Sequence, residues 1–302
     1  MFDSPALDFS PALQQTAGFA ATLGTLGQVP LHLPRHGDLP GLWLWRRRRM
    51  GVPLAMISRA DLGPEVALSL RERLAAEGLA RHLLILSPDA PAPHLSRLGA
   101  VPLMTPARLA ELDLCADAET RLARMDQKWR NRLRHGQKQR LKVSCTNLPP
   151  DPSHWLLKAE VEQQEKRRYR GWPPAISAGY ALANKGQAKL FEAREGAEVI
   201  AAILILCHAP GATYQIGFST ARGRALSAHN LLIWEAAERL SRKGFARLDL
   251  GLIDQRNAPG LARFKLGTGA ALRPLGGTWG WFPPLGRSLG PLARLDARAM
   301  AP

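Results

Sequence analysis

The order of apolar segments in the last third of the chain constrains the fold more than any other feature of the sequence. Strand-like apolar runs are separated by turn residues at Glu195 and Gly196 and at Pro210 and Gly211. The pattern predicts three strands, a helix, a strand and a second helix, over residues 189–195, 198–207, 212–218, 227–243, 246–250 and 258–266. We expect Ser227 to cap the first helix and the strand 246–250 to end at Asp249. Strands that alternate with helices predict an α/β fold, with a mixed central sheet flanked by helices.

A second set of short elements is predicted before residue 119. Residues 42–46 and 52–57 flank a turn and predict a β-hairpin. Residues 64–78 have helical spacing of apolar side chains, and residues 83–86 form a short buried strand. The chain has 302 residues, which is about twice the length of a typical domain. We therefore expect two domains, 1–118 and 119–302.

The segment that follows the predicted boundary is strongly basic. Residues 121–142 contain nine Lys or Arg and one acid, Asp126. One apolar stripe predicts a single long helix over 117–139, and its members are Leu122, Met125, Trp129 and Leu133. A further helix is expected at 152–168, with Glu160 and Glu162 early and basic residues late, which suits the helix dipole.

Composition limits the class of protein. No apolar stretch approaches the about 18 residues that a membrane span needs, and residues 1–10 lack the basic start of a signal peptide. The three cysteines are widely spaced, which argues against disulfides and a zinc site, so we expect a cytoplasmic protein without a metal. The formal net charge of +16 favours polyanionic partners such as nucleic acid or anionic lipid headgroups.

Five short pieces of sequence resemble the FemABX-like family. They are KWRNRLRHGQKQ at 128–139, YQIG at 214–217, NLLIWEA at 230–236, LDLG at 248–251 and GLARFK at 260–265. They occur in the family's order and cover roughly residues 125–270 of this chain. The long coiled-coil arm of some family members is missing here.

The resemblance implies tandem GNAT-like domains, of which the second, 119–302, carries the active site. It also implies an N-acyltransferase that moves an aminoacyl group from aminoacyl-tRNA, or an acyl group from acyl-CoA, onto an amine. Acceptors in the family include peptidoglycan precursors, so the acceptor here is expected to be a small or lipid-linked amine. No tightly bound cofactor is implied.

Three residues are the predicted catalytic groups. Lys265 would stabilise the oxyanion or the leaving 3′-oxygen, since a cation near the donor ester does this well. Asp249, at the end of a predicted strand, would hold or deprotonate the amine. His229 could act as a base near neutral pH. The alternatives are a solvated Lys265, an Asp249 bonded to a neighbouring loop through Arg256 or Arg263, and a His229 that caps or packs.

Five residues are predicted to bind the donor: Phe264, Asn230, Tyr214, Arg222 and Arg224. Phe264 could stack on a terminal adenine, and its alternative is a core position. The helix that begins near 225–230 could meet phosphate with Arg222 and Arg224. The segment ARGRALSAHN has one Gly and matches the Q/R-x-x-G-x-G/A pyrophosphate loop of acyl-CoA-binding GNAT proteins poorly, so the alternative is a surface turn.

The basic segment is the predicted nucleic-acid contact. It would follow a tRNA backbone with Lys128, Arg130, Arg132, Arg134, Lys138 and Arg140. The alternatives are a solvated helix face and peripheral contact with an anionic membrane. The tail 279–300, with Trp279, Trp281 and Phe282 among arginines, could also touch a membrane.

Three functions follow. The first is a tRNA-dependent aminoacyltransferase, the second an acyl-CoA-dependent N-acyltransferase of the same fold, and the third a non-catalytic RNA- or membrane-binding protein.

Overall fold

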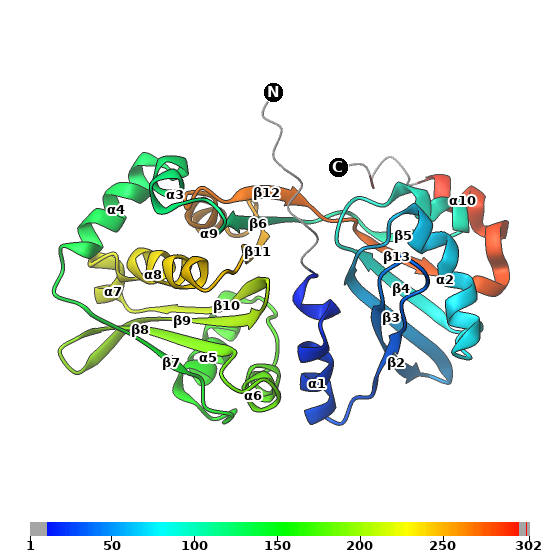
Figure 1. Cartoon of the computed structure of the whole chain (residues 1–302), viewed down its shortest axis with the longest axis horizontal. Coiled ribbons are helices and arrows are strands. Elements are labelled where there is room, and N and C mark those ends of the chain that lie inside the picture. The colour runs from blue at the N-terminus through cyan, green and yellow to red at the C-terminus, as the bar shows by residue number, and fades with distance from the viewer. Residues whose placement is uncertain (1–10, 296–299, 301–302) are drawn as a thin grey trace. The chain divides into compact units, whose positions relative to one another are not determined.

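The computed structural model describes residues 11–295 and 300, which divide into two compact units (Figure 1). The first unit contains Pro11–Arg108 and the chain from Arg273 onward, and the second contains Leu109–Leu272. This division differs from the predicted one at 118 and 119, because the chain returns to the first unit after residue 272. Strand β13 (Thr278–Trp281) pairs there with β4 (Leu83–Pro88) and β5 (Val101–Met104).

The first unit is built on a six-stranded sheet in the order β1-β2-β3-β4-β13-β5. The predicted hairpin is confirmed as β2 (Leu42–Arg49) and β3 (Val52–Ala60), and the predicted helix as α2 (Pro64–Ala76). The other elements of the unit are η1 (Leu13–Gln15), α1 (Ala17–Thr25), β1 (Pro30–Leu33), η2 (Pro93–Leu98), η3 (Pro283–Leu289) and α10 (Gly290–Leu295).

The aromatic residues of the tail belong to the core of the first unit. Trp279 is 1% exposed and Trp281 is 3% exposed. Their indole N–H groups donate to the carbonyl oxygens of Gly276 and Leu98, at 2.9 and 3.1 Å. These two side chains are therefore unavailable for the membrane contact considered above. Arg298, and the side chains of Arg287 and Arg294, lie outside the described residues.

The second unit has a seven-stranded sheet in the order β12-β6-β11-β10-β9-β8-β7. Helix α8 covers one face of its central strands, and α5 and α6 cover the other (Figure 1). The strands are β6 (Arg108–Asp113), β7 (Lys142–Asn147), β8 (Ala188–Glu195), β9 (Glu198–His208), β10 (Gly211–Ser219), β11 (Arg247–Ile253) and β12 (Ala271–Pro274). The helices are α3 (Ala118–Arg124), α4 (Gln127–Gln137), α5 (Trp155–Arg167), α6 (Pro174–Ala183), α7 (Ala221–Ala225), α8 (Ala228–Arg242) and α9 (Pro259–Leu266). The predicted α/β architecture, with mixed sheets flanked by helices in two units, is confirmed.

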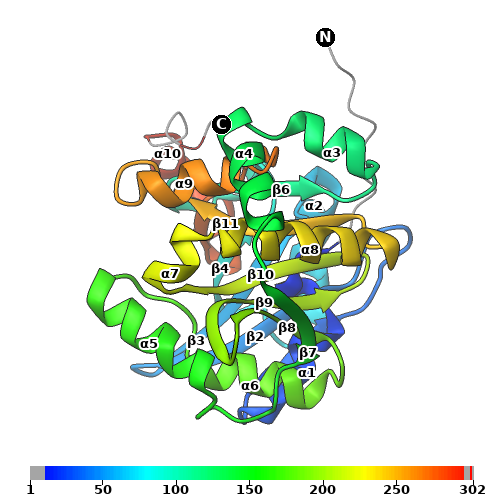
Figure 2. The same cartoon turned by 90° about the vertical axis from the view of Figure 1, so that its left-hand side faces the viewer.

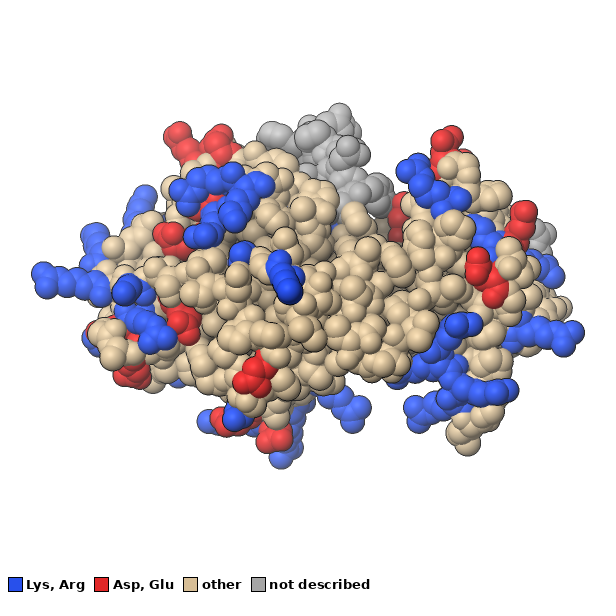
Figure 3. Space-filling model, turned by 60° about the horizontal axis from the view of Figure 1, so that its bottom comes forward, with Lys and Arg blue, Asp and Glu red and all other residues tan. Residues whose placement is uncertain are grey.

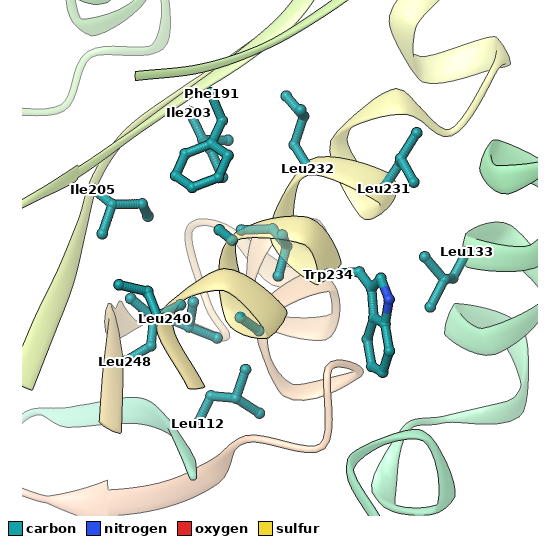
Figure 4. Close-up of a cluster of buried hydrophobic side chains, with 14 of the residues drawn as sticks. Leu112, Leu133, Phe191, Ile203, Ile205, Leu231, Leu232, Trp234, Leu240 and Leu248 are labelled. Atoms are coloured by element: carbon teal, nitrogen blue, oxygen red, sulfur yellow. The ribbon is translucent and has the colours of Figure 1, made fainter. Parts of the chain in front are cut away.

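The core of the second unit lies between α8 and the sheet (Figure 4). Leu232 and Leu240 of α8 meet Phe191, Ile203 and Ile205 from β8 and β9, and all five are almost fully buried. Burial of a large apolar side chain contributes about 1.5–3 kcal/mol, so this layer holds α8 firmly against the strands.

Helix α4 packs on the outer side of α8 (Figures 2 and 4). Trp234 points from α8 toward Leu133 of α4, and the two helices lie against each other in Figure 2 as well. A Cβ atom at Gly136 would lie only 3.0 Å from the Ser227 carbonyl oxygen, so glycine favours the close approach of the helices there.

The prediction of one long helix over 117–139 is wrong. The chain breaks at Met125, which has extended backbone angles, and the amide of Asp126 donates to the Gly267 carbonyl oxygen at 3.0 Å. The apolar stripe is nonetheless real, because Met125, Trp129 and Leu133 are all buried in the same core. Because of the break, both short helices can pack against that core, whereas one straight helix could not keep all of these side chains buried in it.

Strands β10 and β11 separate after a short parallel contact. Three residue pairs join them, of which Thr213 and Asp249 are the last, yet β10 continues to Ser219 and β11 to Ile253. A β-bulge interrupts the β10–β9 register between Tyr214 and Ile216. The sheet therefore opens at Tyr214. Beyond this point, the backbone N–H and C=O groups of β10 and β11 no longer pair with each other.

Within residues 11–295, no helix combines the length and the apolar character of a transmembrane segment.

Candidate active site

Lys265 lies beside the opening between β10 and β11. Lys265 is 8% exposed, and its Nζ donates to the Leu252 carbonyl oxygen at 3.0 Å. Gly251 has a φ of +85°, and a Cβ atom there would lie 3.2 Å from Nζ, so glycine leaves room for the ammonium group. Burial lowers the pKa of Lys265 to about 8, while the charge of Asp249 acts in the opposite direction. The alternative of a solvated Lys265 is therefore wrong.

Asp249 is the last residue of β11 that pairs with β10. The strand does not end there, as predicted, but continues to Ile253. Oδ1 of Asp249 accepts a hydrogen bond of 2.7 Å from the amide of Gly251. The carboxylate thus stands at the point of separation, within electrostatic range of Lys265.

Tyr214 and His229 form a pair on the other side of the opening. The Tyr214 hydroxyl lies 3.0 Å from Nε2 of His229, which projects from the first turn of α8. A Cβ atom at Gly217 would lie 1.7 Å from that hydroxyl and 2.8 Å from Cε1 of His229. The pair therefore packs directly over the Gly217 backbone, where only glycine fits.

His229 is a weaker base than the sequence suggested. Burial lowers its pKa to about 4, although a backbone hydrogen bond with Phe218 acts to raise it. The ring is consequently neutral at physiological pH, with one N–H and one lone pair. Burial also raises the pKa of Tyr214, helped by the charge of Glu160.

Aromatic contacts connect this pair to α9. Phe264 meets the His229 ring edge-on, with the centroids 5.2 Å apart, and lies 6.0 Å from the Trp129 ring. The indole N–H of Trp129 donates to the Phe264 carbonyl oxygen at 3.0 Å. Phe264 is half-buried and packs against the core, so the core alternative holds in part, and stacking on a terminal adenine stays a prediction.

The turn before α8 does not resemble a phosphate cradle. Arg222 forms a bidentate ion pair with Glu195, with distances of 2.8 and 2.6 Å, and Arg224 donates to the Ser219 carbonyl oxygen at 2.8 Å. A Cβ atom at Gly223 would lie 2.1 Å from the Ile200 carbonyl oxygen. This glycine is therefore explained by packing of the turn against β9.

The start of α8 also differs from the prediction. Ser227 has a φ of +54° and its side chain does not cap the helix; its hydroxyl lies 3.3 Å from Nδ1 of His135. Asn230 is 5% exposed, and its Nδ2 has no hydrogen-bond partner among the described residues.

The predicted nucleic-acid contacts lie on and just after α4. Lys128, Arg132, Arg134, Lys138 and Arg140 are exposed, whereas Arg130 is half-buried and donates to the Ala123 carbonyl oxygen at 3.1 Å. Arg130 and Arg134 also line a groove of about 380 Å³ between α3 and α4. On the face of the second unit drawn in Figure 3, in its left half, basic side chains are interspersed with acidic ones.

A pocket of about 250 Å³ lies at the bulge in β10, beside α5 and α6. Its lining includes Glu160, Tyr169, Trp172, Ser177 and Gln215. From the sequence, Glu160 was expected only to suit the helix dipole, and no pocket was predicted here. The sequence pattern that marks the pocket is weak, because a glutamate in a helix followed by aromatic residues in a loop is common on ordinary protein surfaces.

The described residues therefore bring together Lys265, Asp249, Tyr214, His229 and Phe264 around one opening in the sheet. They keep Arg222 and Arg224 in local contacts. A buried cation, a carboxylate, and a hydroxyl held by a neutral imidazole can support acyl transfer, in which charge develops on an oxygen and a proton must move. The described residues contain no cluster of His, Cys, Asp or Glu that could hold a metal ion.

Comparison with known proteins agrees with this chemistry. Residues 115–266, half of the chain, match the family model of the acetyltransferase (GNAT) domain. No curated protein sequence matches the chain. The crystal structure of FemX has a TM-score of 0.72 at 15% identity, covering 91% of this chain and 93% of the FemX chain.

Two further solved structures are similar in fold. The C-terminal domain of a protein described as a lysylphosphatidylglycerol synthetase, from Agrobacterium fabrum, has a TM-score of 0.53 at 15% identity, over 95% of this chain and 93% of that one. The structure of L-PGS from Bacillus licheniformis has a TM-score of 0.54 at 14% identity, over 95% of this chain and 93% of that one. At these identities, the likeness establishes a shared fold.

Proposed function

The chain belongs to the GNAT acetyltransferase family and is an acyltransferase with the fold of FemX, and we propose that it transfers an aminoacyl group from aminoacyl-tRNA to an amine. In this reaction the amine nitrogen bonds to the carbonyl carbon of the donor ester. The ester C–O bond breaks, and the proton lost by the nitrogen ends on the departing 3′-oxygen.

The buried Lys265 is the observation that carries this proposal. An ammonium group has three N–H donors, and Leu252 takes one of them. The remaining donors are available to an oxyanion at the opening between β10 and β11. A lysine with a pKa of about 8 is also a competent general acid near neutral pH, so it can protonate the departing oxygen.

Asp249 is the group best placed to take the proton of the amine. It stands where the strands separate and interacts with Lys265, so a proton received from the amine can return to Lys265 after that residue has donated its own. Tyr214 and His229 then have a positioning role. The neutral imidazole fixes the Tyr214 hydroxyl at the edge of the opening.

The local contacts favour tRNA over CoA as the donor. Arg222 and Arg224, which would hold a pyrophosphate, are engaged with Glu195 and Ser219. Five basic side chains on and after α4, by contrast, are exposed and fit a phosphate backbone: Lys128, Arg132, Arg134, Lys138 and Arg140. The FemABX-like sequence pieces support the same donor. The name of the neighbour from Agrobacterium fabrum includes phosphatidylglycerol, a lipid that accepts the lysyl group through a hydroxyl oxygen, so it supports a lipid-linked acceptor and peripheral membrane contact but not the amine itself.

The proposal is tested by transfer of label from charged tRNA. Purified protein is incubated with tRNA carrying ¹⁴C-labelled amino acids and with two kinds of amine, free amino acids and vesicles that contain phosphatidylethanolamine. We expect label in a base-stable amide product, and about 10²-fold less with Lys265→Ala. Absence of base-stable label with the wild-type protein would contradict the proposal.

A matched charge reversal tests the tRNA contact. Lys128→Glu, Arg132→Glu and Lys138→Glu together should abolish transfer from tRNA. The control reverses three arginines at the exposed tip of the β2–β3 hairpin, Arg46, Arg47 and Arg49, and should retain most activity. Equal losses in the two triple variants would show that general charge, rather than α4, governs the donor.

The second candidate is an acyl-CoA-dependent N-acyltransferase. The GNAT family match supports it, and the unpartnered Nδ2 of the buried Asn230 at the start of α8 offers a donor to a ligand there. Micromolar binding of CoA by isothermal titration, together with acetyl transfer that the α4 reversal leaves intact, would establish this function instead. Loss of cellular function with the α4 reversal but not with Lys265→Ala would instead indicate a non-catalytic RNA-binding protein.

A further inference from the structure

We propose that the pocket at the β10 bulge binds the acceptor, and that this acceptor is a free amino acid whose ammonium group is first held by Glu160. The ammonium releases one proton to solvent, and the neutral amine then attacks the ester as described above. This inference rests on the proposed function, because it names the amine that receives the acyl group. It goes further in assigning the pocket, its polar groups and the chemical class of its ligand.

The position of the pocket supports an acceptor site. Gln215 and Ile216 line it, and they directly follow Tyr214 along β10. Glu160 and Tyr169, on the pocket wall, both act electrostatically on Tyr214. The pocket, on the α5 and α6 face of the sheet, therefore comes near Tyr214 at the β-bulge, beside the opening between β10 and β11.

Glu160 is held firmly but only by neutral groups. Its carboxylate accepts from the Tyr169 hydroxyl at 2.8 Å and from the side-chain amides of Gln164 and Gln163 at 3.1 and 3.4 Å. No ion pair of Glu160 occurs among the described residues. A fixed carboxylate that makes no ion pair, on a pocket wall, is well suited to bind a cation such as a primary ammonium.

The same network shapes the wall of the pocket. Gln164 also accepts from the amide of Gly171 at 2.9 Å, and a Cβ atom at Gly171 would lie 2.5 Å from Nε2 of Gln164. The loop 168–173 is thereby tied to α5. The carboxylate is positioned before any ligand arrives, which lowers the entropy cost of binding.

Two further polar side chains in the pocket indicate that the ligand carries a second polar group besides its ammonium. Ser177 of α6 lines the pocket and is 2% exposed, and its hydroxyl makes no hydrogen bond within the described part of the chain. A hydroxyl that faces the pocket can donate a hydrogen bond to a ligand or accept one from it. Arg170 also lines the pocket and is exposed, without an acidic partner among the described residues. A carboxylate on the ligand would satisfy both groups.

The remaining wall and the size limit the ligand. Leu157, Trp172 and Ile216 provide apolar surface for a side chain. The volume of about 250 Å³ lies just below the about 300–1,000 Å³ that is typical of pockets for drug-sized ligands. An ammonium, a carboxylate and a small side chain together describe an amino acid.

Equilibrium dialysis against an equimolar mixture of the twenty standard L-amino acids tests the pocket without any donor. Mass spectrometry of the retained fraction should identify one or a few amino acids bound by the wild-type protein. Glu160→Gln should weaken their retention about 10- to 100-fold, the loss expected for a charge-assisted contact. Glu162→Gln, on the exposed side of the same helix, should leave retention unchanged. Retention of no amino acid, or equal retention by Glu160→Gln, would overturn the proposal.

Steady-state kinetics then separates the two proposals. With aminoacyl-tRNA saturating, Glu160→Gln should raise the KM for the retained amino acid about 10- to 100-fold and change kcat little. An effect confined to the KM for aminoacyl-tRNA would show instead that the pocket holds the donor's aminoacyl group. If the wild-type protein retains an amino acid in dialysis yet transfers nothing from tRNA, the proposed function fails and the pocket assignment stands.

Discussion

The hydroxyl of Tyr214 lies 3.0 Å from Nε2 of His229, and both groups pack over the backbone of Gly217. The bulge in β10 allows this arrangement, because it changes the strand register between Tyr214 and Ile216. One hydrogen bond thus connects the separated strand to α8, next to the aromatic contact between His229 and Phe264. Substitutions that disturb the Tyr214–His229 pair should therefore lower the rate of transfer more than they lower the stability of the fold.

Gly217→Ala tests the pair by steric means. The new Cβ atom would lie 1.7 Å from the Tyr214 hydroxyl, so the tyrosine must move and the hydrogen bond to His229 must break. We expect transfer to fall about 10²-fold, since a displacement of about 1 Å at a reacting group has this effect. The matched control is Gly260→Ala at the start of α9, where a Cβ atom meets nothing within 4 Å. Similar activity of the two variants would show that Tyr214 does not contribute to transfer.

Stability at low pH should depend on His229. Its pKa falls from an ordinary value of 6.5 to about 4 in the folded protein. Between these values the unfolded chain binds a proton that the folded chain excludes, so the free energy of unfolding decreases as the pH falls from 6.5 toward 4. Urea unfolding at several pH values should show this slope, and His229→Gln should flatten it. An unchanged slope in the variant would assign the acid sensitivity to other groups.

Lys265→Met should separate stability from activity. The pKa of Lys265 is lowered from 10.5 to about 8, so the charged side chain destabilises the fold below the lower value, and the penalty fades as the pH rises toward the higher one. A shift of this size corresponds to about 3 kcal/mol, from which the lost hydrogen bond to Leu252 subtracts about 1 kcal/mol. Chemical denaturation at neutral pH should therefore show a variant about 1–2 kcal/mol more stable than the wild type.

The activity of the same variant completes the test. Transfer should fall about 10²-fold when the cation is lost. The wild-type rate should also decline as the pH rises through about 8, where Lys265 loses its proton, and the variant should lack this decline. A fully active Lys265→Met protein would contradict the role assigned to Lys265.

The sequence predicted the second unit well because its signals are local. Long apolar strands, a periodic helix and turn residues identified β8, β9, β10 and α8 to within a few residues. Lys265, Asp249 and His229 could be selected because short motifs mark them. The neighbourhood of Tyr214 and His229 depends on the β-bulge at Gln215, which no local pattern of the sequence indicates.

The errors came from interactions between distant segments. The helix break at Met125 depends on a backbone bond from Asp126 to Gly267, and the burial of Trp279 depends on strand pairing with residues near Leu86. The predicted phosphate role of Arg222, in α7, did not anticipate its ion pair with Glu195, which lies at the end of β8. Glu160 was not selected from the sequence. Its hydrogen bonds with Tyr169 and Gln164 form a pocket wall only when the loop 168–173 folds back on α5.

Trp129→Phe tests how the core supports the site. Trp129 is 4% exposed, and its indole N–H donates to the Phe264 carbonyl oxygen at 3.0 Å. The phenylalanine variant leaves that carbonyl without its donor, at a cost of about 1–3 kcal/mol. Because Phe264 contacts His229, we also expect transfer to fall about 10-fold through a change in kcat.

The control for this variant is Trp234→Phe in the same core. Trp234 is 8% exposed and points toward α4 (Figure 4), and its indole N–H makes no hydrogen bond within the described residues. This substitution removes a similar packing volume without the contact to Phe264, so thermal unfolding should show destabilisation while transfer by the folded protein stays near the wild-type rate. If both variants lost activity in proportion to stability, the Trp129–Phe264 bond would have only a structural role. A lower kcat in Trp129→Phe alone would show that α4 positions α9 for catalysis.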